Sequence, residues 1–271
     1  MRTALALCGG GCRGVTTAAL LCRSDVQALV GTPDLLAGTS TGGLIALEMA
    51  IGKHPVEIRE SYKAYASRIF SRPWWRRGLF SSKYPPHGIE TVAREIFEHR
   101  RMLSCQTPTM VVSYSLRRRP KVFKSWQDGD ELMRDVARAT SAAPTYFPPT
   151  EEGFVDGGVW ANNPSMCAYV EMHRLWPTET EFRVVCLGTG DAGGEIRASH
   201  AARWGVLGWS TSIANLFMDS GAAGVGYQCR TLMGSNYVEI NPELGSIPAD
   251  MDRCDPEHLD RLQQLGEDWV I

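Results

Sequence analysis

The chain lacks several features that would place it in a class at once. Its 271 residues contain no uninterrupted apolar run of the roughly 18 to 20 residues that a membrane-spanning helix needs. A formal net charge of -2 gives no bulk attraction for nucleic acid or anionic membranes. No His, Cys and Asp residues show metal-ligand spacing. We therefore expect no metal, no organic cofactor and no nucleic-acid polymer as a partner, and only peripheral contact with a membrane.

The cysteines also lack a pattern. The eight of them form no C-x-x-C pair, and several lie in apolar segments, where a reduced thiol packs as a small hydrophobic side chain. The apolar stretch Leu5 to Cys8 follows Arg2 but is too short for the hydrophobic region of a secretory leader. We therefore expect reduced cysteines in a cytoplasmic protein that acts at the membrane surface.

A G-x-S-x-G motif is present at Gly38-Thr39-Ser40-Thr41-Gly42, between an apolar run at 35–37 and a helix-prone stretch at 43–50. This pattern is typical of a nucleophile elbow, in which glycines leave room for a strained corner residue between a strand and a helix. Such a turn exposes the Ser40 hydroxyl at a helix N-terminus, where free N–H groups receive developing negative charge. Alone, the motif is also compatible with an ordinary strand-to-helix turn.

A glycine-rich loop, Gly9-Gly10-Gly11-Cys12-Arg13-Gly14, follows the first predicted strand. It fits a dinucleotide-binding loop, but Asp34, the carboxylate that this interpretation requires, begins the second strand instead of ending it. It also fits an oxyanion hole, because loops at the carboxyl ends of adjacent parallel strands bring the Gly10 and Gly11 N–H groups beside Ser40. We favour the oxyanion hole. Arg13 then holds the loop, pairs with an anionic head group or forms a surface salt bridge.

A third motif, Val155-Asp156-Gly157-Gly158, presents one carboxylate at a glycine-permitted corner, which alone is typical of a hairpin turn. A carboxylate can activate a serine when its surroundings raise its proton affinity. The competing arrangement is a Ser-Asp-His triad. The downstream histidines, His173, His200 and His258, lie in segments typical of exposed or structural histidines, which favours the serine–aspartate pair.

Together, the three motifs and their order resemble the patatin-like phospholipase family. The segments Ala139–Phe147 and Cys186–Gly190 add to the resemblance, which covers residues 3–190. It implies that Ser40 is the nucleophile and Asp156 its base partner, without a catalytic histidine. The implied oxyanion donors are Gly10, Gly11, Cys12 and Thr41, and the supporting motif positions are Gly9, Arg13, Gly14, Gly38, Gly42, Gly157 and Gly158.

Strands alternate with helices along the chain, so we expect a three-layer α/β fold with a largely parallel central sheet and helices on both faces. We expect strands at 4–8, 34–37, 109–116 and 122–126, and helices at 15–30, 41–51, 55–69, 88–99 and from a capping-box pattern at Asp128 to Ser141. Residues 1–190 are expected to form the catalytic core. Residues 191–271 are expected to form a helical part of the same domain, as a lid or acyl-chain wall.

Two aromatic segments are candidates for lipid contact, with core or oligomer packing as the alternative. The first contains Trp74, Trp75 and Phe80 among arginines, and the second contains Trp204 and Trp209. The resemblance implies a serine lipid acyl hydrolase that releases fatty acids from glycerophospholipids. An acyltransferase or a small-ester hydrolase would share the catalytic pair. Compact bacterial relatives include toxic phospholipases switched on by a nucleotide in antiphage defence, so a cyclic-nucleotide activator and a homo-oligomer stay open.

Overall fold

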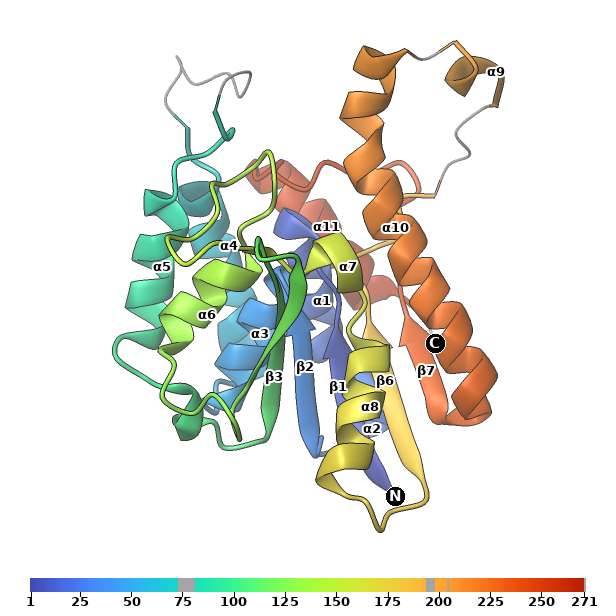
Figure 1. Ribbon diagram of the computed structural model, residues 1–271. Coiled ribbons are helices and arrows are strands. Elements are labelled where there is room, and N and C mark those ends of the chain that lie inside the picture. Colours follow the sequence, from blue (N-terminus) through green and yellow to red (C-terminus); the bar gives the residue numbers. More distant parts are fainter. Residues whose placement is uncertain (73–80, 194–197, 204, 271) are drawn as a thin grey trace.

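A seven-stranded sheet lies between two layers of helices in the described residues of the computed structural model, which are 1–72, 81–193, 198–203 and 205–270 (Figure 1). The strands are β1 (Arg2–Leu7), β2 (Leu35–Thr39), β3 (Thr109–Ser115), β4 (Arg119–Lys124), β5 (Phe154–Asp156), β6 (Phe182–Leu187) and β7 (Tyr237–Ile240). Their order is β4-β3-β2-β1-β6-β7, with β5 also paired to β3. All neighbours are parallel except β4 and β5, which run antiparallel to β3. The predicted α/β fold is confirmed.

The helices follow the strands in the order expected for crossover connections. They are α1 (Gly14–Leu21), α2 (Ser24–Val30), α3 (Thr41–Ala50), α4 (Pro55–Ile69), α5 (His87–Phe97), α6 (Met133–Thr140), α7 (Gly158–Ala161), α8 (Ser165–Leu175), α9 (Ala198–Ala201), α10 (Val206–Met233) and α11 (Pro256–Asp268). Short 3-10 turns occur at Gly11–Arg13, Met102–Ser104 and Gly234–Asn236. In the described part of the chain, no helix combines the length and apolar character needed to cross a membrane.

Two of the predicted helices are corrected by the structure. The helix expected over 15–30 is two helices, because Arg23 takes an extended conformation (φ -80°, ψ 136°) between α1 and α2. The helix expected from Asp128 begins only at Met133. The Asp128 carboxylate instead accepts hydrogen bonds from the Lys124 N–H group and from Lys121 Nζ, and thus holds the end of β4.

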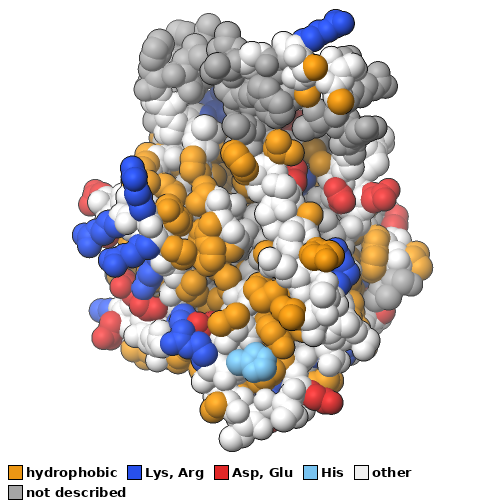
Figure 2. Space-filling model, turned by 45° about the vertical axis from the view of Figure 1, so that its right-hand side comes forward, with side chains coloured by type: hydrophobic (Ala, Val, Ile, Leu, Met, Phe, Trp, Pro, Cys, Tyr) orange, Lys and Arg blue, Asp and Glu red, His pale blue; other side chains and the backbone are white. Residues whose placement is uncertain are grey.

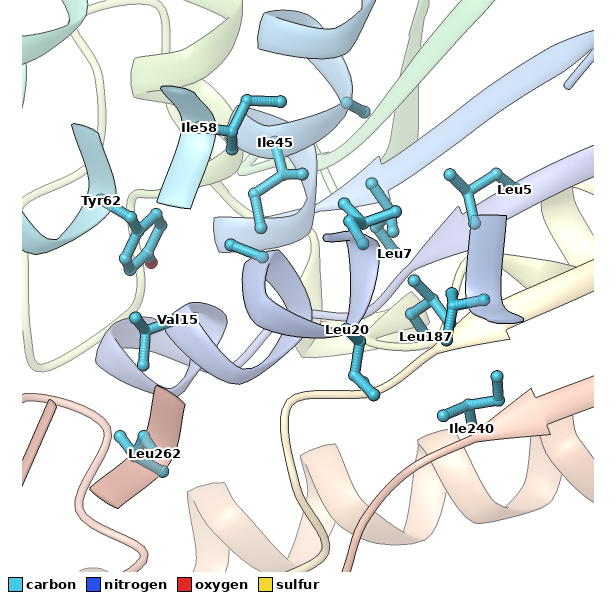
Figure 3. Close-up of a cluster of buried hydrophobic side chains, with 14 of the residues drawn as sticks. Leu5, Leu7, Val15, Leu20, Ile45, Ile58, Tyr62, Leu187, Ile240 and Leu262 are labelled. Atoms are coloured by element: carbon cyan, nitrogen blue, oxygen red, sulfur yellow. The ribbon is translucent and has the colours of Figure 1, made fainter. Parts of the chain in front are cut away.

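The core lies on both faces of the sheet, because successive side chains of a strand point to opposite faces. In β1, Leu5 and Leu7 face α1, α3, α4 and α11 (Figure 3). The other residues labelled in that cluster are Val15, Leu20, Ile45, Ile58, Tyr62, Leu187, Ile240 and Leu262. On the opposite face, Ala4 and Ala6 pack with side chains of α8 and α10, such as Met172 and Cys229. The small alanines allow α8 to lie close to the sheet.

The pairing of β3 explains how two distant motifs meet. β4 runs along one side of β3, from Met110 to Ser115. On the other side of β3, the pairing with β2 ends where Thr39 lies opposite Val112. The pairing with β5 begins at the next residue of β3, where Asp156 lies opposite Ser113. β2 and β5 therefore occupy the same side of β3 one after the other, with their carboxyl ends facing each other. This arrangement brings residues 40 and 156 together.

Candidate active site

Ser40 occupies a strained turn between β2 and α3. Its backbone angles are φ 54° and ψ -124°, a conformation that L-residues rarely adopt, and it caps the N-terminus of α3. A Cβ atom on Gly38 would overlap the Gly42 carbonyl, and one on Gly42 would overlap the Leu7 carbonyl. Both glycines of the G-x-S-x-G motif are therefore required by close backbone packing, and the Ser40 side chain is directed away from the strand.

A buried carboxylate contacts the Ser40 hydroxyl. Ser40 Oγ donates a hydrogen bond of 2.6 Å to Asp156 Oδ2, and the Gly158 N–H group donates one of 2.7 Å to Asp156 Oδ1. Asp156 is only 2% exposed. This burial raises the pKa of Asp156 to about 7, although the two hydrogen bonds lower it in part. A carboxylate with a pKa near neutrality can both accept and return a proton.

Three backbone donors lie beside Ser40. Gly10, Gly11 and Thr41 line the same cavity as the Ser40 side chain. Among the described residues, no hydrogen bond uses the N–H groups of these three positions. The Cys12 N–H group, in contrast, donates a hydrogen bond of 2.7 Å to the Met251 carbonyl. Of the four donors expected from the sequence, Cys12 is thus the one already paired in this structure.

The remaining motif positions shape the loops around this pair. Arg13 is 7% exposed, and its Nη1 donates to the Gly190 carbonyl at 3.2 Å. It therefore anchors the glycine loop inside the protein, and the surface salt bridge considered from the sequence is not formed by any described residue. The motif glycines that allow close approach of neighbouring residues are Gly9, Gly14, Gly157 and Gly158.

Two cavities meet at the Ser40–Asp156 pair. The first, of about 50 Å³, is lined by Ser40 and by apolar side chains, among them Leu44, Ile69, Phe70 and Phe147. The second, of about 570 Å³, is lined by Asp156 and by residues of α7 and α10, including Val159, Trp160 and Phe217. The residues that line both cavities are Ala143, Tyr146, Asp156, Met218 and Met251.

Exposed apolar side chains line the second cavity. In Figure 2, which brings the right-hand side of Figure 1 forward, hydrophobic side chains gather across the middle of the molecule. Val159 on α7 is 42% exposed, and Phe217 on α10 is 65% exposed. The cavity beside Asp156 is therefore lined by exposed apolar side chains.

The described histidines lie away from Ser40. His173, on α8, packs edge-to-face against Tyr169 and Phe182. His258, on α11, is buried, and neither of its ring nitrogens has a hydrogen-bond partner among the described residues. The side chain of His200 lies outside the described residues. In the part of the chain that the structure describes, no histidine lines the two cavities.

The side chains predicted to contact lipid lie outside the described part of the structure. Trp74, Trp75, Phe80 and Trp204 lie outside the described residues, and Trp209 lies in α10 with its side chain outside the description. Three residues that the structure brings to the site were not predicted from the sequence: Thr140, Met218 and Met251. Thr140 belongs to the Ala139–Phe147 segment, and its position just before the Asp156 motif was the available signal. Nothing local to Met218 or Met251 pointed to the site.

The expectation that the cysteines are reduced is corrected at one pair. Cys12 and Cys254 form a disulfide, with Cα atoms 6.1 Å apart. The other six cysteines are free thiols. Sequence spacing gave no signal for this pair, because the two residues are separated by 242 positions.

A mostly parallel α/β sheet with a serine at a strained strand-to-helix turn is an arrangement found in ester-hydrolysing enzymes. The sequence model of the patatin-like phospholipase family matches residues 5–169, more than half of the chain. The chain belongs to this family and is an enzyme of the lipid acyl hydrolase type.

Individual relatives agree with this assignment. The chain is 26% identical to patatin-like protein 2 of Oryza sativa subsp. indica, over 98% of this chain and 83% of the relative. It is 30% identical to a cGAMP-activated phospholipase of Pseudomonas aeruginosa, over 88% of this chain and 77% of that protein. Among solved structures, VipD from Legionella pneumophila shares the fold, with a TM-score of 0.51 and 11% identity over 98% of this chain and 65% of VipD.

Proposed function

We propose that this enzyme cleaves fatty-acyl esters of glycerophospholipids with Ser40 as nucleophile and Asp156 as general base. The observation that carries the proposal is the 2.6 Å hydrogen bond from Ser40 Oγ to a buried carboxylate, made at a strained elbow. Free N–H groups at Gly10, Gly11 and Thr41 support it, because an oxyanion requires donors that are not already paired.

In the first half of the reaction, Ser40 Oγ attacks the ester carbonyl carbon while its proton passes to Asp156 Oδ2. The tetrahedral oxyanion receives hydrogen bonds from the backbone donors. Collapse of this intermediate breaks the bond to the glycerol oxygen, and Asp156 returns its proton to that oxygen. The fatty acyl group is then held as an ester on Ser40.

In the second half, a water molecule gives a proton to Asp156 and attacks the acyl-enzyme carbonyl. Collapse restores the proton to Ser40 Oγ and releases the free fatty acid. One carboxylate serves as acceptor and donor in turn, which requires a pKa near the working pH; burial raises the pKa of Asp156 to about 7. Apolar walls at Leu44, Ile69 and Phe147 favour an acyl chain over a polar substrate.

The proposal is tested by fatty-acid release from mixed phospholipid vesicles. We expect Ser40→Ala and Asp156→Asn to remove release. Ser104→Ala changes an exposed serine that lines neither cavity and should behave as the wild type. Unchanged release by Ser40→Ala would contradict the proposed nucleophile. If the wild type leaves vesicles intact but cleaves a short soluble ester, a small-ester hydrolase replaces the phospholipase.

A second candidate adds regulation: a phospholipase effector that is activated by a cyclic nucleotide and acts at the membrane surface in antiphage defence. The similarity to a cGAMP-activated phospholipase supports it. The same vesicle assay with and without cyclic GMP–AMP, combined with sedimentation, tests it. Release only with the nucleotide, together with assembly into a homo-oligomer, is the expected result. Full activity of the monomer without nucleotide would contradict it.

A further inference from the structure

A short segment of the carboxyl-terminal part lies across the glycine loop. We call residues 250–254, between β7 and α11, the strap. Its Met251 carbonyl accepts the hydrogen bond of 2.7 Å from the Cys12 N–H group. Its Asp252 carboxylate accepts a hydrogen bond of 2.6 Å from Tyr84 Oη and forms an ion pair with Lys83. Its Cys254 is bonded to Cys12. Specific bonds at Met251, Asp252 and Cys254 thus fix the strap to the rest of the protein.

The strap occupies part of the candidate oxyanion site. Gly11 has a φ of 60°, and a Cβ atom there would overlap the Met251 carbonyl, so the strap lies directly on the loop backbone. The Met251 carbonyl accepts the hydrogen bond of the Cys12 N–H group, which lies beside the free N–H groups of Gly10 and Gly11. An oxyanion arriving at this loop would therefore find one N–H group already paired.

The strap also limits the space beside Ser40. The cavity at Ser40 has about 50 Å³, enough for only a few water molecules. Ligand pockets in proteins usually have about 300–1,000 Å³. Met251 lines both this cavity and the larger one of about 570 Å³. Moving the strap away would remove Met251, one of the residues that line both cavities, and would widen the space beside Ser40 for an acyl chain.

One of the bonds that hold the strap, the Cys12–Cys254 disulfide, is chemically reversible. Six of the eight cysteines are free thiols, so the chain does not use disulfides as a general scaffold. In the reducing cytoplasm expected from the sequence, a disulfide is usually transient and catalytic or redox-sensing. Cys12 is fully buried, whereas Cys254 is partly exposed, so Cys254 Sγ is the sulfur that an attacking thiolate can reach.

We propose that Cys12 and Cys254 form a regulatory thiol–disulfide site: the disulfide locks the strap on the oxyanion loop and closes the enzyme, and reduction by a dithiol opens it. A thiolate of the dithiol attacks Cys254 Sγ, and Cys12 leaves as a thiolate that takes up a proton. The second thiol of the reductant then releases Cys254 as a thiol, and the reductant becomes a disulfide. The inference rests on the proposed function of Ser40 and the glycine loop.

The test compares the whole chain in two redox states. The protein is treated with oxidised glutathione or with dithiothreitol, and peptide mass spectrometry verifies the state of Cys12 and Cys254. Fatty-acid release from phospholipid vesicles is measured for the wild type, Cys254→Ser and a matched control, Cys22→Ser, which removes a free thiol away from the strap.

We expect the reduced wild type to release fatty acid about tenfold faster or more, since removal of one oxyanion donor costs about 10²–10³-fold in kcat in other serine hydrolases. Cys254→Ser should match the reduced wild type in both states, and Cys22→Ser should respond as the wild type does. Equal rates in two verified states would overturn the proposal, as would unpaired Cys12 and Cys254 after oxidation.

A second readout on the wild type needs no substitution and no activity. Hydrogen exchange at the Cys12 amide is measured in both redox states. Faster exchange after reduction supports release of the strap, because the hydrogen bond to the Met251 carbonyl protects that amide. Equal exchange overturns the proposal. If neither state hydrolyses any ester, the proposed function fails, and this measurement still decides whether the disulfide controls the strap.

Discussion

Thr140 and Ser40, 100 residues apart in the sequence, are joined by a hydrogen bond of 2.8 Å from the Ser40 N–H group to the Thr140 hydroxyl. The same hydroxyl donates to the Val112 carbonyl at 2.6 Å. Thr140 thus connects the end of α6 to β3 and to the strained turn. A residue held in an unfavourable backbone conformation persists only when its surroundings fix it, and Thr140 supplies one of those contacts.

Thr140→Val should therefore lower both stability and turnover. The substitution keeps the shape of the side chain but leaves the Ser40 N–H group and the Val112 carbonyl without their partner. We expect a loss of about 1–3 kcal/mol in the free energy of unfolding, measured by urea denaturation. We also expect kcat to fall while KM changes little, and Thr140→Ser to restore it. Wild-type kcat in Thr140→Val would show that the turn does not depend on this bond.

The rate of ester cleavage should depend on the ionisation of Asp156. Because burial raises the pKa of Asp156 to about 7, its carboxylate is protonated under acidic conditions and cannot accept the Ser40 proton. We expect kcat/KM to rise with pH and to level off above about pH 7, when it is measured from about pH 5 to about pH 9 on a soluble ester. If kcat/KM instead rose near pH 4, the base would be a carboxylate that is exposed to water during the reaction.

The same burial predicts a stability effect with a defined sign. The pKa of Asp156 is about 7 in the folded protein, whereas an Asp in an unfolded chain has a pKa near 4, so the folded state binds more protons between these values. The stabilisation that this difference gives is fully present below about pH 4 and is lost as the pH rises through about 7.

Asp156→Asn removes the buried charge and retains groups that can hydrogen-bond to Ser40 and Gly158. We expect the variant to be more stable than the wild type at about pH 8 by a few kcal/mol, on the order of the pKa difference expressed as free energy. The advantage should disappear below about pH 4. Thermal unfolding of both proteins across this range checks the prediction, and an advantage that does not change with pH would refute its electrostatic cause.

Gly42→Ala should disrupt the turn at Ser40. The added Cβ would overlap the carbonyl groups of Leu7 and Cys8, which are backbone atoms of β1 and its end and cannot move without shifting the sheet. We expect a loss of about 2 kcal/mol or more in unfolding free energy, together with loss of ester cleavage. Gly224→Ala is the matched control, because a Cβ at that position of α10 meets open space. Alanine is the better helix former, so this control should be neutral or slightly stabilising.

Local sequence patterns predicted the site motifs and the fold class. The strand-to-helix turn at Ser40, the glycine loop and the corner at Asp156 are each short segments whose glycines satisfy steric demands within a few residues. The alternation of strands and helices follows from the periodicity of apolar residues, and it predicted the layered α/β fold. Two helix boundaries were predicted less well: Arg23 is extended and separates α1 from α2, and the Asp128 carboxylate accepts a hydrogen bond from the Lys124 N–H group instead of capping a helix.

Contacts between distant segments were decided by the tertiary structure alone. β2 and β5 share one side of β3, and this register brings Ser40 to Asp156 and to Thr140. The strap reaches Cys12 only because α11 packs on α1 and carries Cys254 to the glycine loop. The physical reason is that strand register and helix packing depend on side chains from the whole core, so no short segment contains the information that places these residues together.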